Sequence, residues 1–186
     1  MDIQATDIPE VKVIRPARYG DDRGYFSEVY NRRALAEAGI DLEFVQDNQS
    51  FSKDPYTLRG LHFQGPPAAQ SKLLRVLRGS VLDIAVDCRI GSPSFGRHVM
   101  VELSAANGHQ VLCPRGFAHG TLTLEPDTEI TYKVDAFYAP DLEHGVRCDD
   151  PDLAIEWPIP THRLVLSSKD RNLPRFRDLP KVFTYP

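Results

Sequence analysis

The sequence predicts an all-β protein whose short strands form a barrel, with only short helices at its periphery. Apolar and polar residues alternate with a period of two in one segment after another, as in strands with one buried face. Turn-forming residues separate these segments at short intervals, at 78–80, 89–96, 105–108 and 113–116. Short strands at this spacing are typical of a sandwich or barrel.

The strand pattern is clearest between residues 81 and 103. In VLDIAVDC, Leu82 and Ile84 face one way, while Asp83 and Asp87 face the other. HVMVEL alternates in the same manner, so both segments are predicted to be half-buried strands. The alternation continues in three later segments: HQVLC, TLTLE and EITYKVDAFY.

One helix is expected in the first half of the chain, in NRRALAEAG. Asn31 can cap its start, and Gly39 can end it in a left-handed conformation. From Pro140 onward the sequence is rich in proline and charge, which indicates a tail of short turns over the barrel. No repeat or linker divides the chain, so we expect residues 1–186 to form a single domain with an N-terminal strand extension and this wrapping tail.

The composition argues against some partners and locations. A net charge of -4 and a pI near 5.8 disfavour a protein that binds nucleic acid through its phosphates. No apolar run is long enough to cross a bilayer, and the acidic N-terminus leads into no secretion signal. Cys88, Cys113 and Cys148 lie far apart and form no CxxC pair. We therefore expect a cytoplasmic protein without disulfides, thiolate zinc or a membrane anchor.

Four polar side chains stand out in the predicted strands. Arg59 and His62 lie three residues apart in TLRGLHFQ, Lys72 shares the apolar face of KLLRVLRG, and Tyr132 shares that of EITYKVDAF. Each also has a purely structural explanation. The arginine can simply face solvent, and the histidine can be a core side chain with its hydrogen bonds made. The lysine can extend to the barrel rim, and the tyrosine can hydrogen-bond inside the core. An inward-facing ammonium needs a polar or anionic partner, however. Interior histidine, lysine and tyrosine together favour a functional site.

GHQVLCPRGFAH, residues 108–119, resembles the second motif of the cupin superfamily. A cupin is a small jelly-roll barrel that holds a ligand inside, which agrees with the predicted strands. Where many cupins have an HxH motif followed by Glu, this chain has His62, Phe63 and Gln64, without a second His or nearby Glu. The metal ligand set is incomplete, although His62 and His119 keep a metal-dependent cupin as a rival hypothesis.

Further motifs resemble the dTDP-4-dehydrorhamnose 3,5-epimerase family, in the family's order and from about residue 3 to residue 170. They are DDRGYFSEVY, FVQDNQSFS, TLRGLHFQGPPAAQSKLLRVLRG, GSPSFG, PRGFAHG and LSSKD. The resemblance implies a metal-free cupin-type jelly roll without a cofactor, usually a homodimer. It also implies an isomerase that inverts C3 and C5 of a dTDP-4-keto-6-deoxyhexose.

By this resemblance, four residues carry the chemistry. His62 is the base that removes a proton beside the C4 ketone, and Tyr132 is the acid on the opposite face. Asp170 orients the base, and Lys72 stabilises the enolate oxygen. An imidazole suits the first role because its proton equilibrium lies near neutral pH.

Ten further positions match substrate contacts of the family. The cations that match diphosphate contacts are Arg23, Arg59 and Lys169. The nucleotide-end positions are Glu28, Gln46 and Asn48, the aromatic rings that could stack on thymine are Phe26 and Tyr138, and the remaining substrate contacts are His119 and Glu143. For both aromatic rings, packing in the core is an equally good explanation.

The chain departs from the family pattern at three positions. Cys148 stands where relatives often have Trp, Ser168 replaces an acidic residue, and Phe63 replaces Tyr. The smaller side chain of Cys148 can alter the loop packing or the nucleotide environment, whereas neither of the other two replacements changes a proposed catalytic group. Two alternatives stay open: a single-site 3- or 5-epimerase of a related nucleotide sugar, and a non-catalytic cupin that binds a sugar nucleotide.

Overall fold

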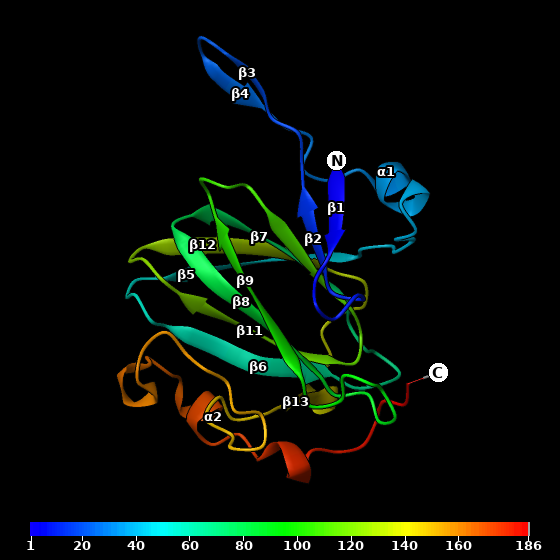
Figure 1. The fold of residues 1–186 in the computed structure, drawn as a ribbon, viewed down its shortest axis with the longest axis vertical. Coiled ribbons are helices and arrows are strands. Elements are labelled where there is room, and N and C mark those ends of the chain that lie inside the picture. The colour runs from blue at the N-terminus through cyan, green and yellow to red at the C-terminus, as the bar shows by residue number, and fades with distance from the viewer. Residues whose placement is uncertain (186) are drawn as a thin grey trace.

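The computed structural model describes residues 1–185, in which two antiparallel sheets pack face to face (Figure 1). The six-stranded sheet has the order β1 (Asp2–Ala5), β2 (Lys12–Arg15), β10 (Gln110–Cys113), β7 (Lys72–Arg78), β12 (Thr128–Val134) and β5 (Gln46–Ser52). The five-stranded sheet has the order β13 (Glu143–Gly145), β6 (Leu58–Gln64), β11 (Phe117–Thr123), β8 (Ser80–Asp87) and β9 (His98–Ser104). The predicted all-β architecture is confirmed.

Apolar side chains from both sheets meet between the layers. The six-stranded sheet contributes Leu74, Val76, Val111 and Ile130, and the five-stranded sheet contributes Val81, Ala85, Val99 and Leu103. Lys72 and Tyr132 share the inward faces of their strands with members of this core, as the alternation predicts. The polar side chains therefore occupy one end of the interior, next to the apolar core.

The C-terminal tail covers the outer face of the five-stranded sheet. Leu61, Ile84 and Val86 point away from the other sheet and pack against tail residues, among them Trp157, Leu179 and Phe183. The prediction that residues 81–88 form a half-buried strand is therefore wrong, since almost every side chain of β8 is buried. A period-two pattern does not show that a segment distant in sequence also covers the outer face of the sheet. Cys148 packs under the same tail, and its carbonyl accepts a hydrogen bond from the indole of Trp157 at 2.8 Å.

Short helices lie at the periphery, as expected. Helix α1 (Arg32–Glu37) is capped by Asn31, whose side chain accepts from the Ala34 N–H at 3.2 Å, and Gly39 follows with a φ of +82°. The tail carries α2 (Ser168–Arg171) and the 3₁₀ turns η1 (Pro140–Leu142), η2 (Thr161–Arg163) and η3 (Phe176–Asp178). None of the helices within residues 1–185 is long and apolar enough to span a membrane.

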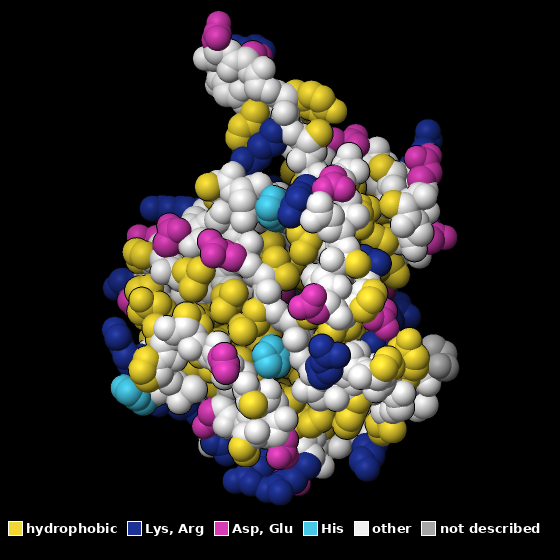
Figure 2. All heavy atoms as spheres, in the orientation of Figure 1, with side chains coloured by type: hydrophobic (Ala, Val, Ile, Leu, Met, Phe, Trp, Pro, Cys, Tyr) yellow, Lys and Arg dark blue, Asp and Glu magenta, His cyan; other side chains and the backbone are white. Residues whose placement is uncertain are grey.

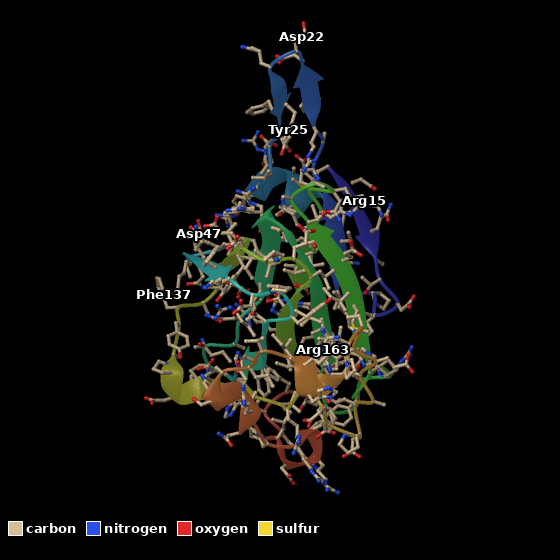
Figure 3. The ribbon with its side chains drawn as sticks, turned by 90° about the vertical axis from the view of Figure 1, so that its left-hand side faces the viewer. Arg15, Asp22, Tyr25, Asp47, Phe137 and Arg163 are labelled. Atoms are coloured by element: carbon tan, nitrogen blue, oxygen red, sulfur yellow. The ribbon has the colours of Figure 1, made fainter. Side chains whose placement is uncertain are left out.

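A hairpin projects beyond the sandwich. Strands β3 (Tyr19–Asp21) and β4 (Gly24–Phe26) pair only with each other and stand clear of the main sheets (Figures 1 and 3). Aromatic residues dominate it, and the side chain of Phe26 is 71% exposed. The hairpin therefore leaves three aromatic residues exposed: Tyr19, Tyr25 and Phe26.

A buried carboxylate fixes the turn that follows β8. Asp87 is 0% exposed and accepts hydrogen bonds from Arg89 at 2.7 and 2.9 Å, Ser92 at 2.5 Å and Ser94 at 2.6 Å. Burial acts to raise the pKa of Asp87, but the contacts from Arg89 and the two serines lower it overall. Arg89 also lies over the rings of Phe117 and Tyr185, which ties the tail to this turn.

Replacing Asp87 with alanine should cost about 3 kcal/mol of unfolding free energy, because Arg89 would keep only Glu10 as an ionic partner and Ser92 and Ser94 would lose their buried acceptor. Urea denaturation at neutral pH measures this loss. Asp149→Ala is the matched control, since Asp149 pairs with Arg147 at 2.6 Å in a more exposed place. We expect it to cost less than about 1 kcal/mol.

The Asp87 contribution should also depend on pH. The native fold holds the pKa of this carboxyl below its unfolded value of about 4, so the stabilisation is present above that pH. It is lost as the pH falls through the lower folded value. The difference between wild type and Asp87→Ala should therefore shrink in acid, and a difference that stays constant to low pH would contradict the assignment.

Candidate active site

A β-bulge brings Arg59 and His62 into one cavity. In a regular strand, residues three apart point to opposite faces. Here His62 pairs with His119 while Arg59 pairs with Thr121, so β6 has one residue more than β11 between these pairs. Gly60 lies at the extra position with a φ of +121°, and a Cβ there would meet the His119 carbonyl oxygen at 2.7 Å. The bulge therefore explains how Arg59 and His62, three residues apart in TLRGLHFQ, point into the same cavity.

The predicted site residues converge between the sheets. A cavity of about 330 Å³ is lined by Arg59, His62, Lys72, His119, Tyr132, Lys169 and Asp170. An adjoining cavity of about 280 Å³ shares His62, Lys72 and Tyr132 and adds Gln46, Asn48, Tyr138 and Glu143. Residues from both sheets and from the tail therefore line two adjoining cavities that share three polar side chains.

His62 and Asp170 form the closest pair in the cavity. The His62 Nε2 lies 2.6 Å from an oxygen of Asp170, which comes from α2. Ser167 caps this helix, since its hydroxyl accepts from the Asp170 N–H at 3.0 Å. Burial acts to raise the pKa of Asp170, but its contacts with His62 lower it overall, so the carboxylate is ionised. An ionised carboxylate only accepts, so Nε2 carries the proton and Nδ1 is the basic nitrogen.

Lys72 and Tyr132 are both disfavoured in their charged forms. Burial lowers the pKa of Lys72, whose ammonium donates to the His62 carbonyl at 3.2 Å. Burial also raises the pKa of Tyr132, the charge of Glu143 adds to this rise, and the charge of Arg59 opposes it. Tyr132 is therefore a protonated phenol at neutral pH.

Glu143 joins the two sides of the cavity mouth. Its Oε2 accepts from the Tyr138 hydroxyl at 2.8 Å and from the Lys169 ammonium at 2.5 Å. Burial acts to raise the pKa of Glu143, but its hydrogen bonds from Lys169 and Tyr138 lower it overall. Nearby on β5, the Gln46 amide donates to Asn48 at 2.8 Å. The mouth is thus a connected polar rim.

A second carboxylate in the interior was not anticipated. Asp83 is 1% exposed and lies 2.8 Å from the Nε2 of His119 on the neighbouring strand. Sequence reasoning placed Asp83 on one face of β8 but gave it no role. The sequence does contain a signal for Asp83: a carboxylate that shares a strand face with Val81 and Ala85 needs a buried partner, just as an inward-facing lysine does.

Three predicted contacts lie outside this cavity. Arg23 pairs with Asp21 at 2.6 Å at the tip of the hairpin, and Phe26 is exposed beside it. Glu28 lines a separate cavity with Tyr30, on the outer side of the six-stranded sheet. Figure 3 shows Asp22 and Tyr25 on the projecting hairpin, away from the sandwich. A single chain does not bring these residues to His62.

No group of three His, Cys, Asp or Glu side chains within residues 1–185 is arranged to hold a metal ion. His62 and His119 instead each place Nε2 against a carboxylate. Figure 2 shows one outer face of the molecule, where apolar side chains and scattered charges of both signs alternate. The dense grouping of ionisable side chains lies inside.

Comparison with known proteins gives a consistent result over nearly the whole chain. A family model described as dTDP-4-dehydrorhamnose 3,5-epimerase matches residues 5–178. An enzyme of that description from Sinorhizobium fredii is 49% identical over 185 residues, which cover 100% of this chain and 94% of the relative.

Solved structures agree. A dTDP-6-deoxy-D-glucose-3,5-epimerase from Legionella pneumophila, in complex with dTDP-4-keto-L-rhamnose, is 41% identical with a TM-score of 0.94, covering 100% of this chain and 98% of that one. A dTDP-4-dehydrorhamnose 3,5-epimerase from Bacillus anthracis, with TDP and PPi bound, is 45% identical with a TM-score of 0.90. The match covers 94% of this chain and 98% of that one. These likenesses confirm the predicted cupin-type jelly roll.

Gly60→Ala should cost about 3 kcal/mol or more of unfolding free energy, because the added methyl meets the backbone of β11 and the φ is unfavourable. Gly91→Ala is the matched control, since Gly91 has a φ of +83° but nothing within 4 Å of the added Cβ. It should cost about 1–2 kcal/mol. Chemical denaturation compares the two, and equal losses would mean that the tight approach at the bulge has no role.

Proposed function

This chain belongs to the dTDP-4-dehydrorhamnose 3,5-epimerase family, and we propose that its cavity around His62 performs the family reaction. The enzyme is an isomerase that converts dTDP-4-dehydro-6-deoxyglucose to dTDP-4-dehydrorhamnose. The observation that carries the site assignment is the His62–Asp170 pair, which faces the same cavity as Tyr132 and Lys72.

The substrate determines what groups are needed. C3 and C5 both flank the C4 ketone, so loss of a proton from either carbon gives an enolate. Return of a proton to the opposite face inverts that carbon. The reaction needs a base, an acid on the other side of the sugar ring, and a positive group near the enolate oxygen.

His62 is the base in this scheme. Asp170 accepts the Nε2 proton, which leaves Nδ1 to remove the carbon-bound proton. Once His62 is an imidazolium, the ionised Asp170 stabilises the new positive charge. Asp170 thus orients the ring in one step and compensates its charge in the next.

Tyr132 is the acid that returns the proton. Burial keeps its phenol protonated, so a proton donor is present at neutral pH. Donation creates a buried phenolate, and the positive charge of Arg59 stabilises it. Arg59 therefore assists the acid in addition to binding a phosphate.

Lys72 stabilises the enolate oxygen. Its ammonium is buried and its pKa is lowered, so a negative charge that develops beside it is strongly favoured. Arg59 and Lys169 bind the diphosphate through charge-assisted hydrogen bonds. The other substrate contacts are the sugar-end residues His119 and Glu143 and the nucleotide-end residues Gln46, Asn48 and Tyr138.

The reaction can be tested with dTDP-4-keto-6-deoxyglucose in deuterated water. Deuterium should enter both C3 and C5 of the inverted product, located by NMR against a protein-free control. His62→Ala should lower exchange at both carbons by about a hundredfold or more. His162→Ala, at an exposed histidine on η2, is the control and should exchange like the wild type.

Each alternative has its own outcome in this experiment. Label at one carbon alone would identify a single-site 3- or 5-epimerase. Binding of the sugar nucleotide without label would indicate a non-catalytic cupin, and a requirement for stoichiometric iron, zinc or manganese would favour the metal-dependent rival. Unimpaired exchange in His62→Ala would reject His62 as the base.

We further propose a homodimer in which the β3–β4 hairpin reaches the cavity of the partner. Arg23, Phe26 and Glu28 match substrate contacts, yet they lie away from the cavity of their own chain. The exposed aromatic residues of the hairpin need a cover. A second copy of this chain can provide the cover and receive the three side chains.

Mixing two inactive variants tests this arrangement. Arg23→Ala and His62→Ala, co-refolded in equal amounts, should regain roughly a quarter of the wild-type exchange, since half of the dimers are mixed and each has one intact site of two. Sedimentation equilibrium should report a dimer. A monomer, or no regained activity from mixed dimers, would show that the hairpin does not complete a partner's site.

A further inference from the structure

Tyr138 presents an exposed ring that is nevertheless held in place. Its side chain is 55% exposed and lies between β12 and η1 at the mouth of the cavity. Its hydroxyl donates to Glu143 at 2.8 Å, and its N–H donates to the side-chain oxygen of Gln46 at 3.1 Å. A ring fixed in this way is a preformed surface for another flat apolar group.

A buried glutamine holds the residues on either side of Tyr138. Gln64 is 4% exposed and follows His62 by two positions on β6. Its Nε2 donates to the carbonyl of Phe137 at 2.9 Å, and its Oε1 accepts from the Ala139 N–H at 2.9 Å. The same Nε2 donates to the Ala68 carbonyl at 2.5 Å. Both ends of this amide are therefore occupied.

A third glutamine extends the same set of contacts. The Gln70 amide donates to the carbonyl of Ala136 at 2.8 Å. Side-chain amides thus bind every residue from 136 to 139, through Gln70, Gln64 and Gln46. Apolar burial does not hold this loop, because the side chain of Phe137 is 69% exposed, as its outward position in Figure 3 illustrates.

We propose that Gln64 is a positioning residue: with Gln46 and Gln70, it clamps residues 136–139 and holds the Tyr138 ring ready to stack on the base of the nucleotide. This inference rests on the proposed function for the identity of the ligand. Gln64 also lines the cavity, but protein partners occupy both ends of its amide, so it acts through Tyr138. The clamp reduces the conformational freedom that the loop would otherwise lose on binding.

Hydrogen exchange tests the clamp without any ligand. In Gln64→Leu, the amide of Ala139 should exchange about tenfold faster or more, because it loses its acceptor. The amide of Tyr138, which donates to Gln46, should also exchange faster, because the bond that holds the Phe137 carbonyl is missing. Gln49→Leu is the matched control, as Gln49 is an exposed glutamine on β5 whose amide bonds Glu129 outside the cavity. Gln70→Leu removes a single bond and serves as a milder variant if Gln64→Leu folds poorly. Unchanged protection of residues 136–139 in both variants would overturn the clamp.

Calorimetry with dTDP tests its consequence for binding. Loss of an ordered aromatic platform should lower the affinity of Gln64→Leu for dTDP roughly tenfold, since stacking on one base contributes this much or more to binding. The kcat at saturating sugar nucleotide should stay within about threefold of wild type, so that the change is in KM. A lowered kcat with unchanged KM would instead mean that Gln64 supports the catalytic strand, and would overturn the proposal.

A double variant separates positioning from general damage. If Gln64 acts through Tyr138, adding Gln64→Leu to Tyr138→Leu should not lower the affinity for dTDP any further. An additive loss would overturn the proposal. If wild type fails to bind dTDP, or Tyr138→Leu binds it unimpaired, the proposed function of Tyr138 fails, while hydrogen exchange still decides whether the clamp exists.

Discussion

The polar interior of the sandwich determines where the rest of the protein buries its apolar side chains. His62, His119, Asp83 and Lys72 occupy part of the space that a jelly roll would otherwise fill with core. The outer sheet faces supply further burial: α1 covers one, and the C-terminal tail covers the other. The five-stranded sheet is thus buried on its outer face as well, and the six-stranded sheet is apolar there where Ile14, Leu73 and Leu112 pack with Leu35 of α1.

This arrangement links folding to chemistry. The tail packs on the outer face of the five-stranded sheet through Leu179 and Phe183, and the same tail brings Asp170 to His62. The hydrogen bond between them joins residues 108 positions apart. Apolar packing outside the barrel therefore positions the carboxylate that contacts His62, the proposed base, and damage to the tail would remove this contact together with the cover.

The parts of the site that follow from strand register could be predicted from sequence. Alternation placed Lys72 and Tyr132 inward, and the structure agrees. Arg59 beside His62 requires the bulge at Gly60, which a period-two pattern does not encode. Asp170 was identified by resemblance, because no local rule pairs residues so far apart. The double burial of β8 was missed for the same reason, since its cover is the distant tail.

In the proposed mechanism, the electrostatics of the cavity favour the transition state over the resting enzyme. Among the described residues, the only hydrogen bond of the Lys72 ammonium is to a backbone carbonyl, and burial lowers its pKa. The Lys72 ammonium thus has no carboxylate of residues 1–185 within hydrogen-bond distance, although the nearby charges of Asp83 and Glu143 favour its charged form. An enolate supplies a further negative charge only as the proton leaves carbon, so the interaction strengthens along the reaction. Tyr132 behaves in the complementary way: burial resists its ionisation, so the proton is given up when a strongly basic carbon is there to take it. Burial of Lys72 and Tyr132 would only reduce stability in an ordinary core. Here it makes the site bind the transition state more tightly than the substrate.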